Sequence, residues 1–136
     1  MLRAMGAAPI AVSALQASTA AQAQTSNSKA HIVIAGSGLA GLALAHRLRS
    51  ALDGARIPVI DAKRQHNYQP GYTLVATGVW PVGKVIDHNA DLMPAGVEWV
   101  QDMVAEFDPA ANAVVTASGQ RIAYDCLIVA VGTHQD

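Results

Sequence analysis

The segment His31-Ile-Val-Ile-Ala35, followed directly by Gly36-Ser-Gly38-Leu-Ala-Gly41, gives the clearest indication of the fold class. Its apolar, β-branched start is typical of a buried parallel strand. The glycines that follow have the spacing G-x-G-x-x-G, which carries a strand through a tight turn into a helix. The start of that helix presents free N–H groups and a positive dipole end, which together attract phosphate. The stretch therefore predicts a strand, a phosphate-binding turn and a helix.

A helix with one apolar stripe and a second strand are predicted after the turn. The helix is expected to run to about Leu52, where Asp53 and Gly54 end it. The second strand is predicted over Ile57–Asp61, and strand, turn, helix and strand within about 30 residues form a βαβ unit. The predicted stripe comprises Gly41, Leu44, Ala45, Leu48, Ala51 and Leu52.

The glycines and Asp61 together predict a dinucleotide site. Gly36 would permit the tight turn, Gly38 the close approach of a pyrophosphate, and Gly41 the close packing of the helix on the strand. Asp61 ends the second strand about 20 residues after the glycines, where a carboxylate accepts hydrogen bonds from a ribose diol. This combination is far more specific than a lone glycine motif.

The remaining segments favour FAD over a nicotinamide dinucleotide. Asp61 fits either cofactor, and its carboxylate disfavours a ribose 2′-phosphate. Lys63 and Arg64 would offset part of that repulsion, although basic residues are also common in a solvated turn. A nicotinamide domain normally continues with further helical crossovers. Here the turns Asp108-Pro109 and Ser118-Gly119 indicate a run of short antiparallel strands instead.

The predicted fold is α/β: a Rossmann-like FAD-binding βαβ unit with a β-meander crossover, incomplete because it is a fragment of a larger two-domain fold. Residues 126–131 form an apolar strand ending at Gly132, expected to be buried on both faces beside the first strand. Between the two apolar strands we expect a polar turn over 63–70, one or two helical turns over 72–77, a loop with some helix over 83–94, and short strands over 97–100, 103–107, 113–117 and 122–124.

Composition fits a chain with a single packed domain. The chain has 136 residues, of which 51% are hydrophobic and 14% charged, with a net charge of −1. No basic run is present and the net charge is near zero, so nothing indicates a nucleic-acid surface. The single cysteine, Cys126, excludes a disulfide or dithiol couple within the chain, and its apolar surroundings predict a buried, inert thiol.

The N-terminal segment differs from the rest. Residues 1–23 are Ala-rich, carry Arg3 and no acid, and end in the A-x-A pattern Ala21–Ala23, which favours an export signal. A disordered leader or a misplaced start codon remain alternatives. We expect a polar linker over 24–29 and a partial FAD-binding domain over 30–136. The expected location is the periplasm or the outer face of the inner membrane, where the protein would be peripheral, with a cytoplasmic location as the alternative.

The stretch from His31 to Gly132 resembles the N-terminal FAD-binding part of the two-dinucleotide-domain flavoprotein oxidoreductases, and within that group is most similar to sulfide:quinone oxidoreductases. The resemblance covers about a hundred residues, roughly the first quarter of such a protein. The residues that carry it are Asp61-Ala-Lys63, His66-Asn-Tyr-Gln-Pro70-Gly-Tyr-Thr-Leu-Val-Ala-Thr-Gly78, Pro94-Ala-Gly-Val-Glu-Trp-Val100 and Tyr124-Asp-Cys-Leu-Ile-Val-Ala-Val-Gly132.

The resemblance implies a cofactor-binding role for particular residues. The pyrophosphate would lie against Gly36, Ser37, Gly38, Ala40 and Gly41, and the adenosine ribose on Asp61. Tyr68, Gln69 and Pro70 would lie near the flavin ring, and Val104 would offer backbone to the adenine edge. Ala130 and Gly132 would border the phosphate and ribitol. Lys63 is the remaining predicted cofactor-binding residue.

The resemblance also implies a reaction for a full-length parent: sulfide is oxidised, and electrons pass through FAD to a membrane quinone. Alternatives are a fragment of a type II NADH:quinone dehydrogenase, of the flavoprotein of flavocytochrome c sulfide dehydrogenase, or a stand-alone, non-catalytic flavin-binding module. We expect this chain to be an N-terminal fragment without catalytic residues. Any peripheral membrane contact would come from a C-terminal region that it lacks.

His66 and the tryptophans have more than one interpretation. A histidine in a loop near a flavin could assist proton transfer, but such a residue more often orients its loop through hydrogen bonds. The other histidines show no metal-ligand spacing. Trp80 and Trp99 are expected to pack rather than to stack on a cofactor.

Overall fold

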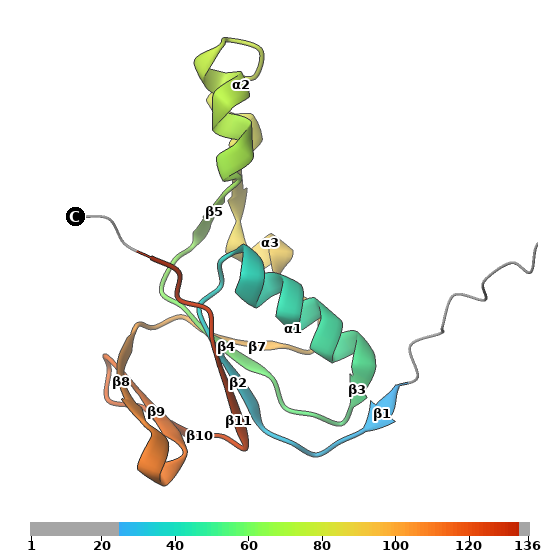
Figure 1. Cartoon of the computed structure of the whole chain (residues 1–136), viewed down its shortest axis with the longest axis vertical. Coiled ribbons are helices and arrows are strands. Elements are labelled where there is room, and N and C mark those ends of the chain that lie inside the picture. Colours follow the sequence, from blue (N-terminus) through green and yellow to red (C-terminus); the bar gives the residue numbers. More distant parts are fainter. Residues whose placement is uncertain (1–24, 134–136) are drawn as a thin grey trace, which may run out of the picture.

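The computed structural model of the chain describes residues 25–133, and its centre is a four-stranded parallel sheet. Helix α1 (Leu39–Ala51) connects two of its strands and lies across one face of the sheet (Figure 1). The predicted βαβ unit is confirmed, and so is the return strand beside the first strand. The strand order is β11-β2-β4-β7, with β2 at Ile32–Ala35, β4 at Pro58–Ile60, β7 at Glu98–Val100 and β11 at Cys126–Val129.

A three-stranded antiparallel meander lies between β7 and β11 in the sequence, as predicted. Its order is β10-β9-β8, with β8 at Val104–Asp108, β9 at Ala113–Thr116 and β10 at Arg121–Ala123. A short 3₁₀ helix, η3 (Pro109–Ala111), and Asn112 in the left-handed region turn the chain from β8 into β9.

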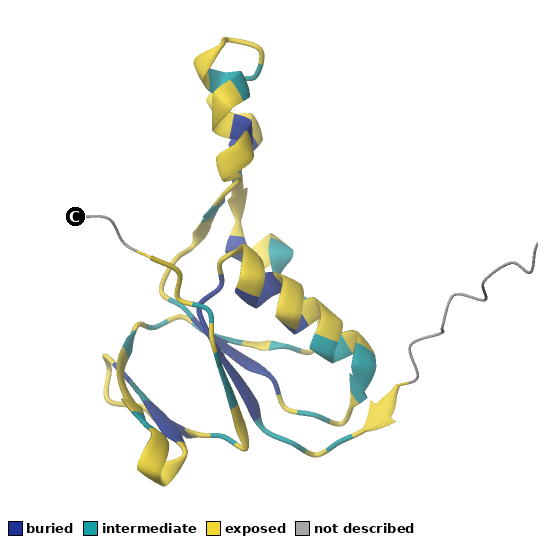
Figure 2. Cartoon of the chain, in the orientation of Figure 1, coloured by how far each residue is buried: buried dark blue, intermediate teal, exposed yellow. Residues whose placement is uncertain are grey.

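The central strands β2 and β4 are buried on both faces of the parallel sheet, because successive side chains of a strand point to opposite faces. Ile34 and Ala45 belong to a buried cluster between the sheet and α1. Val33, Ile60 and Val114 belong to a second cluster between the sheet and the meander. Figure 2 shows this pattern as buried strands at the centre of the molecule. The two clusters fix the carboxyl ends of β2 and β4, where the glycine turn and Asp61 follow.

The strand predicted over 97–100 is not part of the antiparallel run. Instead β7 pairs in parallel with β4, with Trp99 opposite Val59. Three residues carry too little alternation to reveal the direction of pairing. Parallel pairing needs a long crossover, and the segment between β4 and β7 supplies one.

That crossover forms an arm that projects from the body of the molecule (Figure 1). The predicted turn over 63–70 is wrong in part, because β5 and β6 pair there as an antiparallel ribbon. The polar sequence of β5 gave no sign of a strand. The arm comprises β5 (Gln65–Asn67), η1 (Gln69–Gly71), α2 (Tyr72–Ala76), η2 (Val82–Val85) and β6 (Ile86–His88), and α3 (Asn89–Leu92) returns the chain to the body.

Two burial predictions are corrected by the structure. On α1 the buried leucine is Leu42, whereas Leu44 is 36% exposed, because the helix turns the face of Gly41, Leu42 and Ala45 to the sheet. Cys126 is exposed rather than buried. Its strand, β11, pairs only with β2 within residues 25–133, so it is an edge strand and not buried on both faces.

The N-terminal part of the described chain also forms a strand. In the predicted linker, β1 (Ser26–Asn27) pairs in parallel with β3 (Leu52–Asp53) at the end of α1. The predicted leader over 1–23 lies outside the described residues. Among the helices of residues 25–133, none has the length and apolar character needed to span a membrane.

Candidate functional site

The glycine turn joins β2 to α1, and two of its glycines are required by the protein itself. Gly36 has a φ of +106°, and a Cβ there would collide with the carbonyl of Ala130 on the neighbouring strand's end. A Cβ on Gly41 would collide with the carbonyl oxygen of Gly36. These contacts confirm the tight turn and the close helix–strand packing that the spacing predicts.

Gly38 differs from its two neighbours in the motif. It has an ordinary φ of −70°, and a Cβ built on it would meet nothing within 4 Å. The protein's own packing therefore does not require a glycine here. A ligand that approaches the backbone closely would require one, because a side chain would fill the space.

Asp61 lies immediately after β4 and faces the glycine turn. Its Oδ2 accepts hydrogen bonds from the Ser37 backbone N–H at 2.7 Å and from the Ser37 hydroxyl at 2.9 Å. Its Oδ1 accepts from the Lys63 backbone N–H at 2.8 Å. The carboxylate is thus fixed as an acceptor, half-buried, with about one lone-pair direction, on Oδ1, left for a further donor.

Two further residues hold this arrangement, and neither role was predicted from the sequence. Trp99 donates its indole N–H to the backbone carbonyl of Asp61 at 2.9 Å. Asn89, 1% exposed at the start of α3, donates through Nδ2 to the Ser37 hydroxyl at 2.6 Å and to the Lys63 carbonyl at 2.8 Å. Trp99 was expected only to pack, and Asn89 lies in a segment with no clear pattern.

A groove of about 810 Å³ runs from this cluster along the base of the arm to the end of β11. It brings together most of the predicted cofactor-binding residues: Ser37, Gly38, Asp61, Lys63, Tyr68, Gln69, Pro70, Ala130 and Gly132. Gly36 and Gly41 shape the turn beneath it, and Ala40 follows on α1. Val104 does not line the groove but packs against the cluster under the meander, and its adenine contact stays a prediction.

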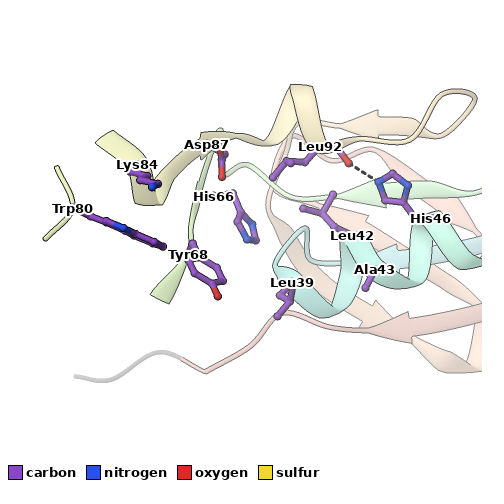
Figure 3. Close-up of a pocket in the computed structure, with 10 residues that line it drawn as sticks. All are labelled: Leu39, Leu42, Ala43, His46, His66, Tyr68, Trp80, Lys84, Asp87 and Leu92. Carbon is purple, nitrogen blue, oxygen red and sulfur yellow. Dashed lines mark hydrogen bonds between the residues drawn. The ribbon is translucent and has the colours of Figure 1, made fainter. Parts of the chain in front are cut away.

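A second groove, of about 490 Å³, lies between α1 and the arm (Figure 3). Leu39 and Leu42 line it from α1, and Tyr68 and Trp80 line it from the arm, with the Lys84 ammonium 4.3 Å from the centre of the Trp80 ring. His66, half-buried on β5, lines both grooves. Both roles considered for His66, proton transfer and orientation of its loop, stay predictions.

Comparison with known proteins agrees with this geometry. Residues 30–136 match the family model described as pyridine nucleotide-disulphide oxidoreductase. The chain belongs to this family. The match includes the glycine turn, Asp61, the arm and β11, so every part of the candidate site lies within the family domain.

Distant homology to sulfide:quinone oxidoreductases extends over most of the chain. The mitochondrial enzyme of Mus musculus is 32% identical over 112 residues, 82% of this chain and 25% of its own length. That of Dictyostelium discoideum is 36% identical over 102 residues, 74% of this chain and 23% of its length. The crystal structure of the sulfide:quinone oxidoreductase from Aquifex aeolicus superposes with a TM-score of 0.66 at 27% identity, covering 76% of this chain and 24% of that one. The chain thus spans about a quarter of the length of these relatives.

Proposed function

We propose that this chain binds FAD as the N-terminal portion of a flavoprotein oxidoreductase. The observation that carries the proposal is the open space above Gly38, next to Ser37 and Asp61 in one groove. No contact within the described chain explains a glycine at that position, whereas a pyrophosphate lying on the backbone does. The start of α1, with its free N–H groups, supplies the favourable electrostatic environment.

The groove also accounts for the two ends of the cofactor. Asp61 would accept hydrogen bonds from the adenosine ribose, and Ser37 with Gly38 would hold the pyrophosphate. Tyr68, Gln69 and Pro70 line the same groove and would border the flavin. Ala130 and Gly132 would border the ribitol of the cofactor, between the flavin and the phosphates. Members of this family typically bind FAD. Bound FAD would supply two-electron redox chemistry, while the protein supplies binding and orientation.

Reconstitution tests the binding proposal. The full 136-residue chain is refolded or expressed with excess FAD and separated from free ligand by gel filtration. Flavin absorption in the visible region is expected to coelute with the protein, and the same treatment with the Asp61→Ala variant is expected to yield little. A folded wild-type chain that elutes without flavin at any FAD concentration would overturn the proposal.

For the full-length parent we propose oxidation of sulfide with transfer of electrons to quinone. The support is the homology to sulfide:quinone oxidoreductases and the arm segment from His66 to Gly78. The test is steady-state reduction of a soluble ubiquinone analogue by the longest protein that the gene encodes. Sulfide-dependent reduction is the expected result, whereas reduction that needs NADH and ignores sulfide would favour the NADH dehydrogenase alternative.

Export of the protein is a second proposal, based on the leader-like sequence of residues 1–23. N-terminal sequencing of the protein recovered from its native host should begin at Gln24. Recovery of the intact N-terminus from the cytoplasm would contradict export.

A further inference from the structure

A buried side chain behind the cofactor groove has a role that the proposed function does not include. Asn89 is 1% exposed and is one of few buried polar residues in the described chain. It comes from α3, at the base of the arm, whereas its partners Ser37 and Lys63 come from the glycine turn and from the loop after β4. One amide therefore joins three segments that are far apart in the sequence.

The direction of these hydrogen bonds is determined by their partners. The Lys63 carbonyl can only accept, so the group of Asn89 that faces it at 2.8 Å is the amide NH₂. The same Nδ2 lies 2.6 Å from the Ser37 hydroxyl and donates its second hydrogen there. The hydroxyl oxygen is then occupied as an acceptor, and its own hydrogen points to Oδ2 of Asp61, 2.9 Å away. Asn89, Ser37 and Asp61 thus form one directed chain of hydrogen bonds.

Both oxygens of the Asp61 carboxylate are linked to Asn89 through these residues. Oδ2 accepts from the Ser37 hydroxyl, which Asn89 orients, and also from the Ser37 backbone N–H. Oδ1 is held by the Lys63 backbone N–H, and the carbonyl of that same residue is fixed by Asn89. A carboxylate of the protein that is already fixed in this way does not have to be ordered when the ligand associates. This lowers the free-energy cost of binding.

We propose that Asn89 is a positioning residue that orients Asp61 for the diol of an adenosine ribose. It acts through Ser37 on one oxygen of Asp61 and through Lys63 on the other. The inference rests on the proposed binding of an adenine dinucleotide. To that binding the inference adds specificity. The site should distinguish a ribose from a 2′-deoxyribose, and this distinction should depend on Asn89.

The test uses ADP and 2′-deoxy-ADP as probes, titrated calorimetrically into the full chain and its variants. In the wild type, loss of the 2′-hydroxyl should weaken binding about tenfold, because a hydrogen bond to a charged group is lost. Asn89→Asp keeps the size of the side chain but replaces the donor with an acceptor that repels the Lys63 carbonyl. It should weaken ADP binding by about fivefold or more and reduce the distinction between the probes to about twofold or less.

A double-mutant cycle with Ser37→Ala tests whether Asn89 acts through its neighbours. If it does, Asn89→Leu should weaken ADP binding much less in the Ser37→Ala background than in the wild type. Thr116→Val is the matched control: Thr116 is equally buried and hydrogen-bonded but lies in the meander. It should lower the melting temperature without changing the preference for ADP over 2′-deoxy-ADP.

The outcomes separate the two proposals. Folded Asn89→Asp and Asn89→Leu variants that retain the wild-type preference for ADP would overturn the role of Asn89 and leave FAD binding intact. Additive losses in the double-mutant cycle would also overturn it. A folded wild-type chain that binds neither FAD nor ADP would overturn the proposed function, and this inference with it.

Discussion

At the scale of single residues, the glycines of one motif are present for different reasons. Gly36 combines a φ of +106° with a carbonyl contact that leaves no room for a Cβ, so the fold requires it. Gly38 has ordinary backbone geometry and open space where its Cβ would be. Substituting alanine at each position therefore separates a structural requirement from a ligand requirement.

We predict that Gly36→Ala destabilises the chain, while Gly38→Ala leaves its thermal unfolding unchanged or slightly stabilised. Alanine at Gly36 faces both a strained φ and a steric clash, which together cost about 2 kcal/mol or more. Circular dichroism melts of the chain without ligand measure this difference. With FAD or ADP added, Gly38→Ala should bind about tenfold more weakly than the wild type. Equal affinity would show that the ligand does not approach the turn closely.

The sequence predicted the residues of this site in part. Asp61 and the glycines were predictable because their roles depend on backbone conformation and on position at a strand end. Asn89 and Trp99 were not, because each acts through a contact across more than 30 positions of sequence. A polar residue in a poorly patterned segment carries no sign of the partner it will meet.

At the scale of the elements, the meander depends on carboxylates that close its turns. Hydrogen bonds from the Ser118 side chain, and then from Thr116 and the Ser118 backbone, hold the pKa of Asp102 well below its ordinary value. A hydrogen bond from the Arg121 guanidinium, and then one from the Ala111 N–H, lower the pKa of Asp108. Both groups are partly exposed to solvent, so the effect on stability is one of direction and not of large size.

We predict that acid weakens the chain through these turns. Because the pKa of each carboxylate is lower in the folded than in the unfolded chain, its stabilising contribution is complete above the unfolded value of about 4 and is lost as the pH falls further. Melting temperatures measured from about pH 7 down to pH 3 should therefore decline below pH 4. In Asp102→Asn the decline should be shallower. An identical decline in both proteins would contradict this account of Asp102.

The exposure of the edge strand β11 leads to a further prediction. Its apolar sequence suggested a strand buried on both faces, but in the described chain it has one neighbour and its Cys126 is exposed. The sequence reveals that such a run is a strand but not how many neighbours it has. Ellman's reagent should therefore modify Cys126 in the native chain to the same extent as in denaturant. Protection of the thiol in the native chain would show that this edge is covered.

At the scale of the whole molecule, the site lies where the carboxyl ends of the parallel strands meet the base of the arm. Ligands of open α/β sheets bind at this edge, so the position followed from the predicted βαβ unit. The arm was not predicted, because its polar ribbon has no alternating pattern. It supplies Tyr68, Gln69 and Pro70, the part of the groove that extends beyond an adenosine diphosphate.

The most direct test of the account is a comparison of the equilibrium affinities of the full chain for FAD, ADP and NAD⁺ by calorimetric titration. All three ligands share the adenosine diphosphate that Asp61 and Gly38 are proposed to hold. Only FAD carries the flavin that the arm is proposed to border. We predict that FAD binds at least about tenfold more tightly than ADP, a difference of about 1.4 kcal/mol, and that NAD⁺ binds no more tightly than ADP. An affinity for NAD⁺ that exceeds the affinity for FAD would contradict it.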